Sequence, residues 1–366
     1  MEPYFAIVLV VILLAFVSDG LNRAFAARRL SQRPLVTSPI RRWGPLDLAV
    51  AAVLVGFAGS RLNVGTDYSV YYAVYARMAP DTWRDYLTSP QEVGFASLMV
   101  ATKQFSSSPY GIFWVASLVS IVPALVALRQ RAHWPALALA LYVLLGPYLG
   151  PFNVLRQGMA VAVLFWGAGF LKRRPWLFVV AGVAAASLHV SAAIAALVMV
   201  GCVRWRPTPR SISLVLAAGL PVTVALANIS IVRGWLTALN PRYDQYVEGS
   251  GSGVGAYLTV FAYLALIVYA LSLKPRLVRN GSDEPMFTAL SVFGVAFMIV
   301  GTQSVVLARM SMYFTIFIVL LVANRVSASK APHLHAVVVM AAALVFFAMY
   351  LANYGGLIPY SSTMVT

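Results

Sequence analysis

Five polar side chains surrounded by apolar sequence are the first candidates for chemistry: Asp67, Glu92, Arg156, His189 and Arg309. His189 lies in SLHVSA, at the middle of the otherwise uncharged run 175–203. An imidazole can exchange a proton at physiological pH, so His189 is a candidate general base or acid. Asp67 and Glu92 are alternative bases, and we favour His189 or Asp67 in that role.

The arginines suggest binding of a phosphate. Arg156 in FNVLRQGMA and Arg309 in LARMSMYF each open an apolar run. Guanidinium groups match phosphate oxygens in pairs and keep their charge, so these two residues could clamp a diphosphate at a membrane surface. Gln157 and Arg61 are further candidate substrate contacts.

Structural roles are the alternatives for the same residues. The arginines could instead pair with Asp67, Glu92, Asp244 or Glu248. The imidazole of His189 could be satisfied locally by the hydroxyls of Ser187 and Ser191.

A stripe of tyrosines follows Asp67 in GTDYSVYYAVYARM. Tyr68, Tyr71, Tyr72 and Tyr75 have the i, i+3, i+4, i+7 spacing of one helical face. One interpretation is an interfacial helix of the aromatic belt. The other is a carbohydrate platform, formed mainly by Tyr68 and Tyr72, because aromatic rings present apolar faces to sugar C–H groups.

Motifs for a bound cofactor or metal are missing from the sequence. It has no phosphate-binding glycine loop, no HExxH, no Cys/His metal spacing and no GxSxG elbow. We therefore expect no cofactor and no metal.

The elements that must position these residues are membrane helices. Hydrophobic residues make up 61% of the 366 residues and charged residues 10%, which is typical of a polytopic membrane protein. Despite a net charge of +16, the basic residues alternate with apolar runs and form no continuous basic face, so nucleic acid is not an expected partner. The expected apolar segments are 3–18, 46–60, 110–128, 134–150, 157–171, 175–203, 211–232, 254–273, 286–305, 308–323 and 334–351.

These segments predict an all-α, polytopic integral membrane protein with about 10 to 12 transmembrane helices, including re-entrant or broken segments. We expect one transmembrane domain over residues 1–366. Outer loops are expected near 61–92 and 233–255, and a basic inner loop at 19–45. The short segment 93–105 is interpreted as re-entrant or interfacial.

The distribution of positive charge predicts the orientation. Most of the 27 Lys and Arg residues fall in the connections on one side, which is therefore the expected cytoplasmic side. Both ends of 175–203 then lie on that side, so two short helices should meet near His189 at a turn that lines a cavity. The alternative is one long tilted helix, which makes 95–105 a full span and moves the charges at 129–131 and 172–174 outside.

Six motifs in order, GTDYSVYY, EVGF, NVLRQGMAVA, SLHVSA, ARMSMYF and IPYSS, resemble those of the EpsG family of Wzy-like polysaccharide (O-antigen or exopolysaccharide) repeat-unit polymerases. The resemblance implies a glycosyltransferase that joins repeat units carried on undecaprenyl diphosphate. The growing chain would move from its lipid diphosphate to a hydroxyl of the next lipid-linked unit. It also implies a multi-pass protein of the bacterial inner membrane whose active site faces the periplasm or cell exterior.

By this resemblance, function is expected at Asp67, Glu92, Arg156, His189 and Arg309. Tyr313, in the ARMSMYF motif, is a further candidate substrate contact. The expected partners are the undecaprenyl-diphosphate-linked oligosaccharide and the lipid bilayer, with a chain-length regulator and a flippase in the same system.

Other functions stay open at this point. A polysaccharide ligase would use the same chemistry. A flippase or transporter of lipid-linked oligosaccharide would also use cavity-lining arginines and a broken helix, although no matching sequence halves are found. A membrane acyltransferase would use an intramembrane histidine.

Overall fold

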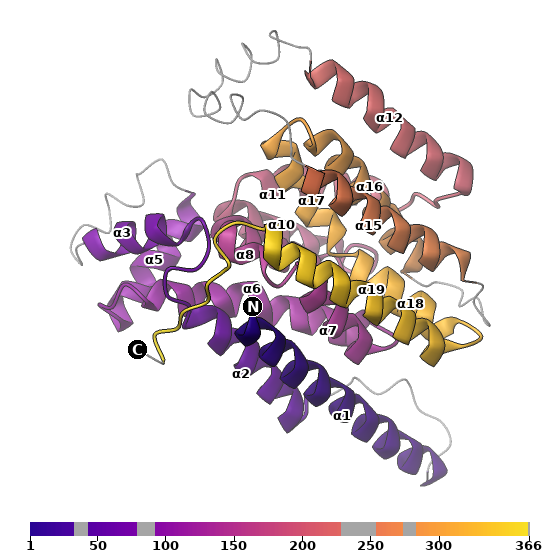
Figure 1. Ribbon diagram of the computed structural model, residues 1–366, viewed down its shortest axis with the longest axis horizontal. Helices are drawn as coiled ribbons and strands as arrows, with labels where there is room; N and C mark the ends of the chain where they lie inside the picture. The colour runs from indigo at the N-terminus through magenta and orange to yellow at the C-terminus, as the bar shows by residue number, and fades with distance from the viewer. Residues whose placement is uncertain (33–42, 79–91, 228–253, 274–282, 365–366) are drawn as a thin grey trace. The chain divides into compact units, whose positions relative to one another are not determined.

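The computed structural model describes residues 1–32, 43–78, 92–227, 254–273 and 283–364 (Figure 1). Within those ranges the regular elements are helices, and the only β pairing is an isolated bridge between Arg61 and Ser362. Six described helical segments are long and apolar enough to cross a membrane, and four further apolar helices are shorter. The predicted all-α, polytopic membrane fold is confirmed.

The chain forms two compact units, which are described separately below. Unit 1 comprises residues 1–196 and 336–366, and unit 2 comprises residues 197–335. The helices of unit 1 are α1 (Glu2–Gln32), α2 (Pro45–Gly59), α3 (Tyr68–Arg77), α5 (Val93–Phe105), α6 (Gly111–Arg131), α7 (Pro135–Leu144), α8 (Gly150–Asn153), α9 (Leu155–Gly167) and α10 (Pro175–Leu188). Those of unit 2 are α12 (Pro209–Ala227), α15 (Val254–Ser272), α16 (Glu284–Gly301), α17 (Val305–Thr315) and α18 (Ile318–Ala328). The unit boundaries fall within α11 (Ser191–Cys202) and α19 (Pro332–Asn353).

Two expected segments differ from the structure. Helix α1 continues to Gln32, so residues 19–32 of the expected inner loop are helical. Good helix formers fill this stretch, and Arg23 pairs with Asp19 one turn earlier at 2.7 Å. The expected span 134–150 is interrupted after Leu144, because Gly146 takes a φ of +94° that ends the helix.

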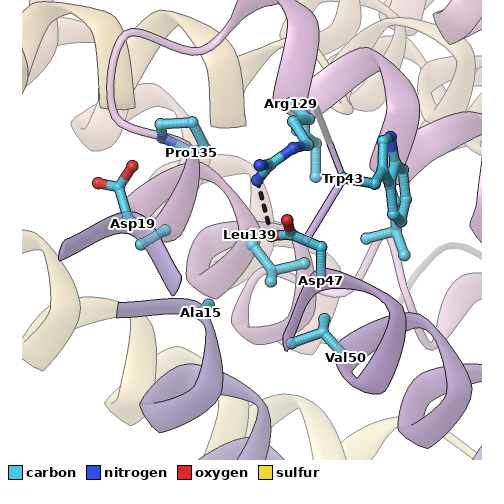
Figure 2. Close-up of a pocket in the computed structure, with 11 residues that line it drawn as sticks. Ala15, Asp19, Trp43, Asp47, Val50, Arg129, Pro135 and Leu139 are labelled. Atoms are coloured by element: carbon cyan, nitrogen blue, oxygen red, sulfur yellow. Dashed lines mark hydrogen bonds and ion pairs between the residues drawn. The ribbon is translucent and has the colours of Figure 1, made fainter. Parts of the chain in front are cut away.

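Unit 1 has two chemically different ends. Helices α2 and α6 are antiparallel, since Asp47 pairs with Arg129 at 2.7 Å at one end and Gly59 packs against Trp114 at the other. The basic end also contains the connection 172–174, which follows α9. Figure 2 shows a pocket at this end, where Asp47 and Arg129 face each other. This is the end that the charge distribution predicts to be cytoplasmic.

Helix α9 is parallel to α6, because Arg131 at the end of α6 donates hydrogen bonds to the carbonyls of Phe165 and Trp166 in the last turn of α9. The first turn of α9, which carries Arg156, therefore lies at the opposite end of unit 1 from Arg129 and residues 172–174, which we call the basic cluster. Gly59 and the connection that leads from α2 to α3 lie at that same end.

The run 175–203 folds as a helical hairpin. Helices α10 and α11 contain 14 and 12 residues and are separated by His189 and Val190. Gly182 and Ala196 are equally far from His189 along the chain, and a Cβ placed on Gly182 would lie 3.6 Å from that of Ala196. In one continuous helix the two positions would be about 20 Å apart. The predicted break at His189 is therefore confirmed, and the single tilted helix is wrong.

The two ends of unit 1 give a topology test. Ser69→Cys in α3, an exposed position, should react with a membrane-impermeant maleimide in intact cells, because it lies at the end without the basic cluster. Lys172→Cys is exposed at the opposite end and should react only after the membrane is opened. Gel-shift labelling measures both, and the buried Cys202 gives little background. If only Lys172→Cys is labelled in intact cells, the protein has the opposite orientation in the membrane to the one predicted.

Candidate functional site

A single carboxylate connects two of the predicted site residues. Glu92 Oε1 lies 2.9 Å from Nδ1 of His189, and Glu92 Oε2 pairs with Nη1 of Arg156. The three side chains come from the connection before α5, from α9 and from the turn after α10. They are 17%, 29% and 25% exposed for Glu92, Arg156 and His189, so each is held in place yet still reachable by a ligand.

Tyr71 extends this network onto α3. The Nε of Arg156 donates a hydrogen bond of 3.0 Å to the Tyr71 hydroxyl. Burial raises the pKa of Tyr71, and the negative charge of Asp67 one turn earlier adds to the rise. The Tyr71 phenol therefore stays neutral and accepts the hydrogen bond from Arg156. Asp67, Tyr71, Glu92, Arg156 and His189 form one group, which we call the polar cluster.

The protonation of Glu92 follows from its partners. Burial would raise its pKa, but the hydrogen bond from His189 and the charge of Arg156 outweigh burial and lower the pKa to about 2. Glu92 is therefore an anion at neutral pH and a poor base. Because a carboxylate can only accept hydrogen bonds, Nδ1 of His189 is assigned the proton, which leaves Nε2 as the basic nitrogen.

Local sequence explains why the hairpin turn meets Glu92. His189 follows the last turn of α10 in extended backbone, with φ −157° and ψ 119°. Gly94 allows the start of α5 to approach this turn, because a Cβ at Gly94 would lie 2.7 Å from the carbonyl oxygen of Ser187. Ser187 donates its own hydrogen bond to the carbonyl of Ala184. The imidazole is thus paired with the Glu92 carboxylate, while the Ser187 hydroxyl is directed elsewhere.

The predicted tyrosine stripe is confirmed as a helical face, but most of that face is buried. Tyr68 is 4% exposed and stacks on Phe113, with centroids 4.3 Å apart. Its ring is covered by this packing, and the expectation that Tyr68 offers a platform for sugar stays a prediction. Tyr72 is half-buried and remains a candidate substrate contact. The stripe residue that joins the site is Tyr71, whose position one helical turn after Asp67 was the available sequence signal.

Arg61, another predicted substrate contact, is also buried against aromatic rings. It is 2% exposed, with the rings of Phe113 and Phe152 4.9 and 4.7 Å from its Cζ, and its Nη1 donates to the Ala58 carbonyl at 2.6 Å. Burial lowers the pKa of Arg61 to about 10, so the group remains charged at neutral pH. Cation–π contacts and a carbonyl stabilise this charge inside the protein. The contact of Arg61 with substrate stays a prediction.

Gln157, Arg309 and Tyr313 complete the predicted set. Gln157 is 3% exposed, so its side chain is closed to a ligand. Arg309 is half-buried in α17 and Tyr313 is fully buried, and both belong to unit 2. Helices α16 and α17 form a tight hairpin there, because a Cβ at Gly301 would lie 2.5 Å from the Ala308 backbone. Arg309 lies near the turn of this hairpin, in the first half of α17.

Other predicted residues lie outside the described part of the chain, including Asp244 and Glu248. Among the residues that the structure describes, no group of three or more His, Cys, Asp or Glu side chains could hold a metal ion. The chemistry available at the polar cluster is proton transfer at His189 and charge neutralisation by Arg156.

Comparison with known proteins identifies the family. The EpsG family model matches residues 46–362, which include the whole polar cluster and Arg309. No curated protein and no solved structure matches the chain. The EpsG family is associated with Wzy-like polymerases. Since the matched range covers most of the sequence, the chain belongs to the EpsG family.

Proposed function

We propose that the protein is a glycosyltransferase that polymerises undecaprenyl-diphosphate-linked repeat units at the outer face of the bacterial inner membrane. The family supports a polysaccharide polymerase-type function. The observation that carries the finer proposal is the chain of contacts from Arg156 through Glu92 to His189. It places a guanidinium and the Nδ1 of an imidazole on the same carboxylate, at the end of unit 1 opposite Arg129 and residues 172–174.

His189 is the proposed general base. With Nδ1 held by Glu92, Nε2 can accept the proton of an acceptor sugar hydroxyl. The carboxylate of Glu92 fixes the ring and stabilises the imidazolium that forms, a division of roles that catalytic triads also use. Asp67, in the same cluster, is the alternative base.

Arg156 is proposed to stabilise the leaving group. The acceptor oxygen bonds to the anomeric carbon of the growing chain, the bond from that carbon to the phosphate oxygen breaks, and undecaprenyl diphosphate leaves with the electron pair. A guanidinium beside the phosphate oxygens lowers the cost of the negative charge that develops on them. Arg309 belongs to unit 2, and its contact with the phosphate stays a prediction. The leaving group is already an anion, so a guanidinium can serve without a metal.

Substitution of Arg156 tests the reaction. Arg156→Ala should abolish polymer and cause single repeat units to accumulate on the lipid at the outer face, because transfer stops after export. Arg156→Lys should restore little, since an ammonium lacks the two-pronged geometry. Arg77→Ala, an exposed arginine in the last turn of α3, is the matched control and should retain normal polymer.

Lipid-linked oligosaccharide profiling measures these outcomes. Retention of the repeat units on the cytoplasmic side would indicate a flippase. Normal polymer that fails to reach a final acceptor would indicate a ligase. Either pattern contradicts the polymerase proposal.

Glu92 and His189 should act as one unit. Single changes to alanine are expected to lower the polymerisation rate by about 10² to 10⁴-fold, and the double variant should be no worse than the more severe single variant. Glu92→Gln should also be strongly impaired, because its amide can donate to Nδ1 and move the proton to Nε2. Rates in purified protein with lipid-linked repeat units provide the test. Losses that multiply in the double variant would show that the two residues act independently.

Gly94 should tolerate no side chain. Gly94→Ala would place a Cβ against the Ser187 carbonyl and move the turn that carries His189, so we expect at least about a tenfold loss of rate. Gly56→Ala is the control, because that helical glycine has open space within 4 Å of its Cβ position. Equal rates in the two variants would rule out the close approach of α5 to the hairpin turn as a requirement.

A further inference from the structure

The last described residues of the chain pack against the connection between α2 and α3. Residues Gly355–Thr363 follow α19, and we call them the C-terminal strap. The backbone N–H of Leu62 donates to Ser361 O at 2.9 Å, and that of Gly65 donates to Gly356 O at 2.6 Å. In Figure 1 the yellow trace leaves α19 and crosses the same end of unit 1 as α3 and α5. The strap therefore holds the connection that leads into the polar cluster.

A second set of contacts closes the strap near its far end. The backbone N–H of Thr363 donates to Ser60 O at 2.7 Å, and the hydroxyls of Ser362 and Ser60 are 3.0 Å apart. Tyr360 stacks on Phe57 with centroids 4.0 Å apart. The strap is thus fastened to the end of α2 by backbone, hydroxyl and ring contacts.

Asn153 joins the strap to the segment that carries Arg156. Its Nδ2 donates to Gly355 O at 2.9 Å, and its Oδ1 accepts the backbone N–H of Thr66 at 2.8 Å. The residue is buried, with 6% relative exposure. One amide therefore bridges the strap and the start of α3, while Arg156 follows three residues later in the first turn of α9.

These contacts form a closed ring with the polar cluster. Thr66, two residues before α3, contacts Asn153, while Tyr71 in α3 accepts a hydrogen bond from Arg156. The start of α3 and the start of α9 are thus joined at two separate points. The path between them at Asn153 is tight, because a Cβ on Gly65, whose φ is +100°, would lie 2.7 Å from the carbonyl carbon of Phe152.

We propose that Asn153 and the C-terminal strap are positioning elements, which fix Tyr71 and Arg156 relative to each other without touching substrate. The strap follows the whole of unit 2 in sequence, so the polar cluster is completed only when the end of the chain returns to unit 1. This inference rests on the proposed function only where activity is the readout.

Asn153→Ala tests the bridge. It removes both side-chain hydrogen bonds, and we expect kcat to fall by about 10 to 100-fold with KM changed less than about threefold, because misplacement affects the transition state more than binding. Asn153→Asp keeps the acceptor for Thr66 and loses the donor to Gly355, so it should be intermediate. Asn353→Ala, an exposed asparagine just before the strap, is the control and should match the unaltered protein. An unchanged kcat in Asn153→Ala would overturn the proposal.

Truncation tests the strap itself. A chain that ends at Tyr354 lacks the strap, whereas one that ends at Thr363 keeps it. The shorter chain should insert into the membrane normally, but its kcat should fall by the same factor as that of Asn153→Ala. The longer chain should be fully active. Equal rates from the two truncations would overturn the proposal.

A covalent lock separates positioning from general damage. In the Asn153→Ala background, Ser60→Cys and Ser362→Cys should form a disulfide on treatment with diamide, because the two hydroxyls are in contact. The lock should recover at least about tenfold in kcat, and reduction should remove the gain. A disulfide that forms fully and restores nothing would contradict a positioning role.

Hydrogen exchange gives a readout that needs no activity. Amides at 66–71 and 154–158 should exchange faster in Asn153→Ala than in Asn353→Ala, while those in α6 should not change. If neither the unaltered protein nor the two variants polymerise repeat units, but exchange at these amides increases in Asn153→Ala, the proposed function fails and the positioning role stands. If exchange is unchanged, the positioning role fails whatever the activity.

Discussion

The arrangement of the site depends on one half-buried carboxylate. Glu92 accepts from Arg156 and His189, so it joins segments that are 64 and 97 residues away in sequence. Hydrogen bonds to charged groups contribute about 1.5 to 3 kcal/mol each, and partial exposure reduces that value here. The same contacts keep Glu92 ionised and determine which nitrogen of His189 carries the proton. The fold brings the segments that carry Glu92, Arg156 and His189 close together. The contacts of the Glu92 carboxylate then determine where the protons lie on Glu92 and His189.

Much of this could be predicted because membrane helices leave strong signals. Apolar runs and the distribution of basic residues predicted the all-α membrane fold, the hairpin at His189 and the side on which Arg156 should lie. A lone histidine in an apolar run implies a buried or cavity-lining imidazole, and that inference needs no tertiary information. The grouping of Glu92 with Arg156 and His189 was suggested by family resemblance, and geometry was needed to show that Glu92 bridges the other two.

Two predicted substrate contacts are buried for a common physical reason. Tyr68 and Arg61 have residue types that suit sugar and phosphate, but their environments are set by aromatic rings from α6 and α8 that sequence spacing does not locate. Phe113 covers both residues, so they became part of the packing beneath the site. Asn153 was overlooked for the opposite reason: a single amide at the end of the four-residue helix α8 gives no periodic signal, and its importance comes from partners near residue 66 and near residue 355.

Glycine explains how such distant segments can meet. Gly94 lets α5 reach Ser187, Gly65 lets the connection after α2 pass the Phe152 carbonyl, and Gly301 closes the hairpin that carries Arg309. Gly65 and Gly94 lie in motifs whose charged residue was the visible signal, and Gly301 packs against Ala308, the residue before Arg309. The motifs thus combine a reactive group with a neighbouring point of close backbone approach. A residue such as Arg156 can be tested by changing its charge, but the precision of its placement is determined by these small contacts, because packed backbones shift together when one of them is forced apart.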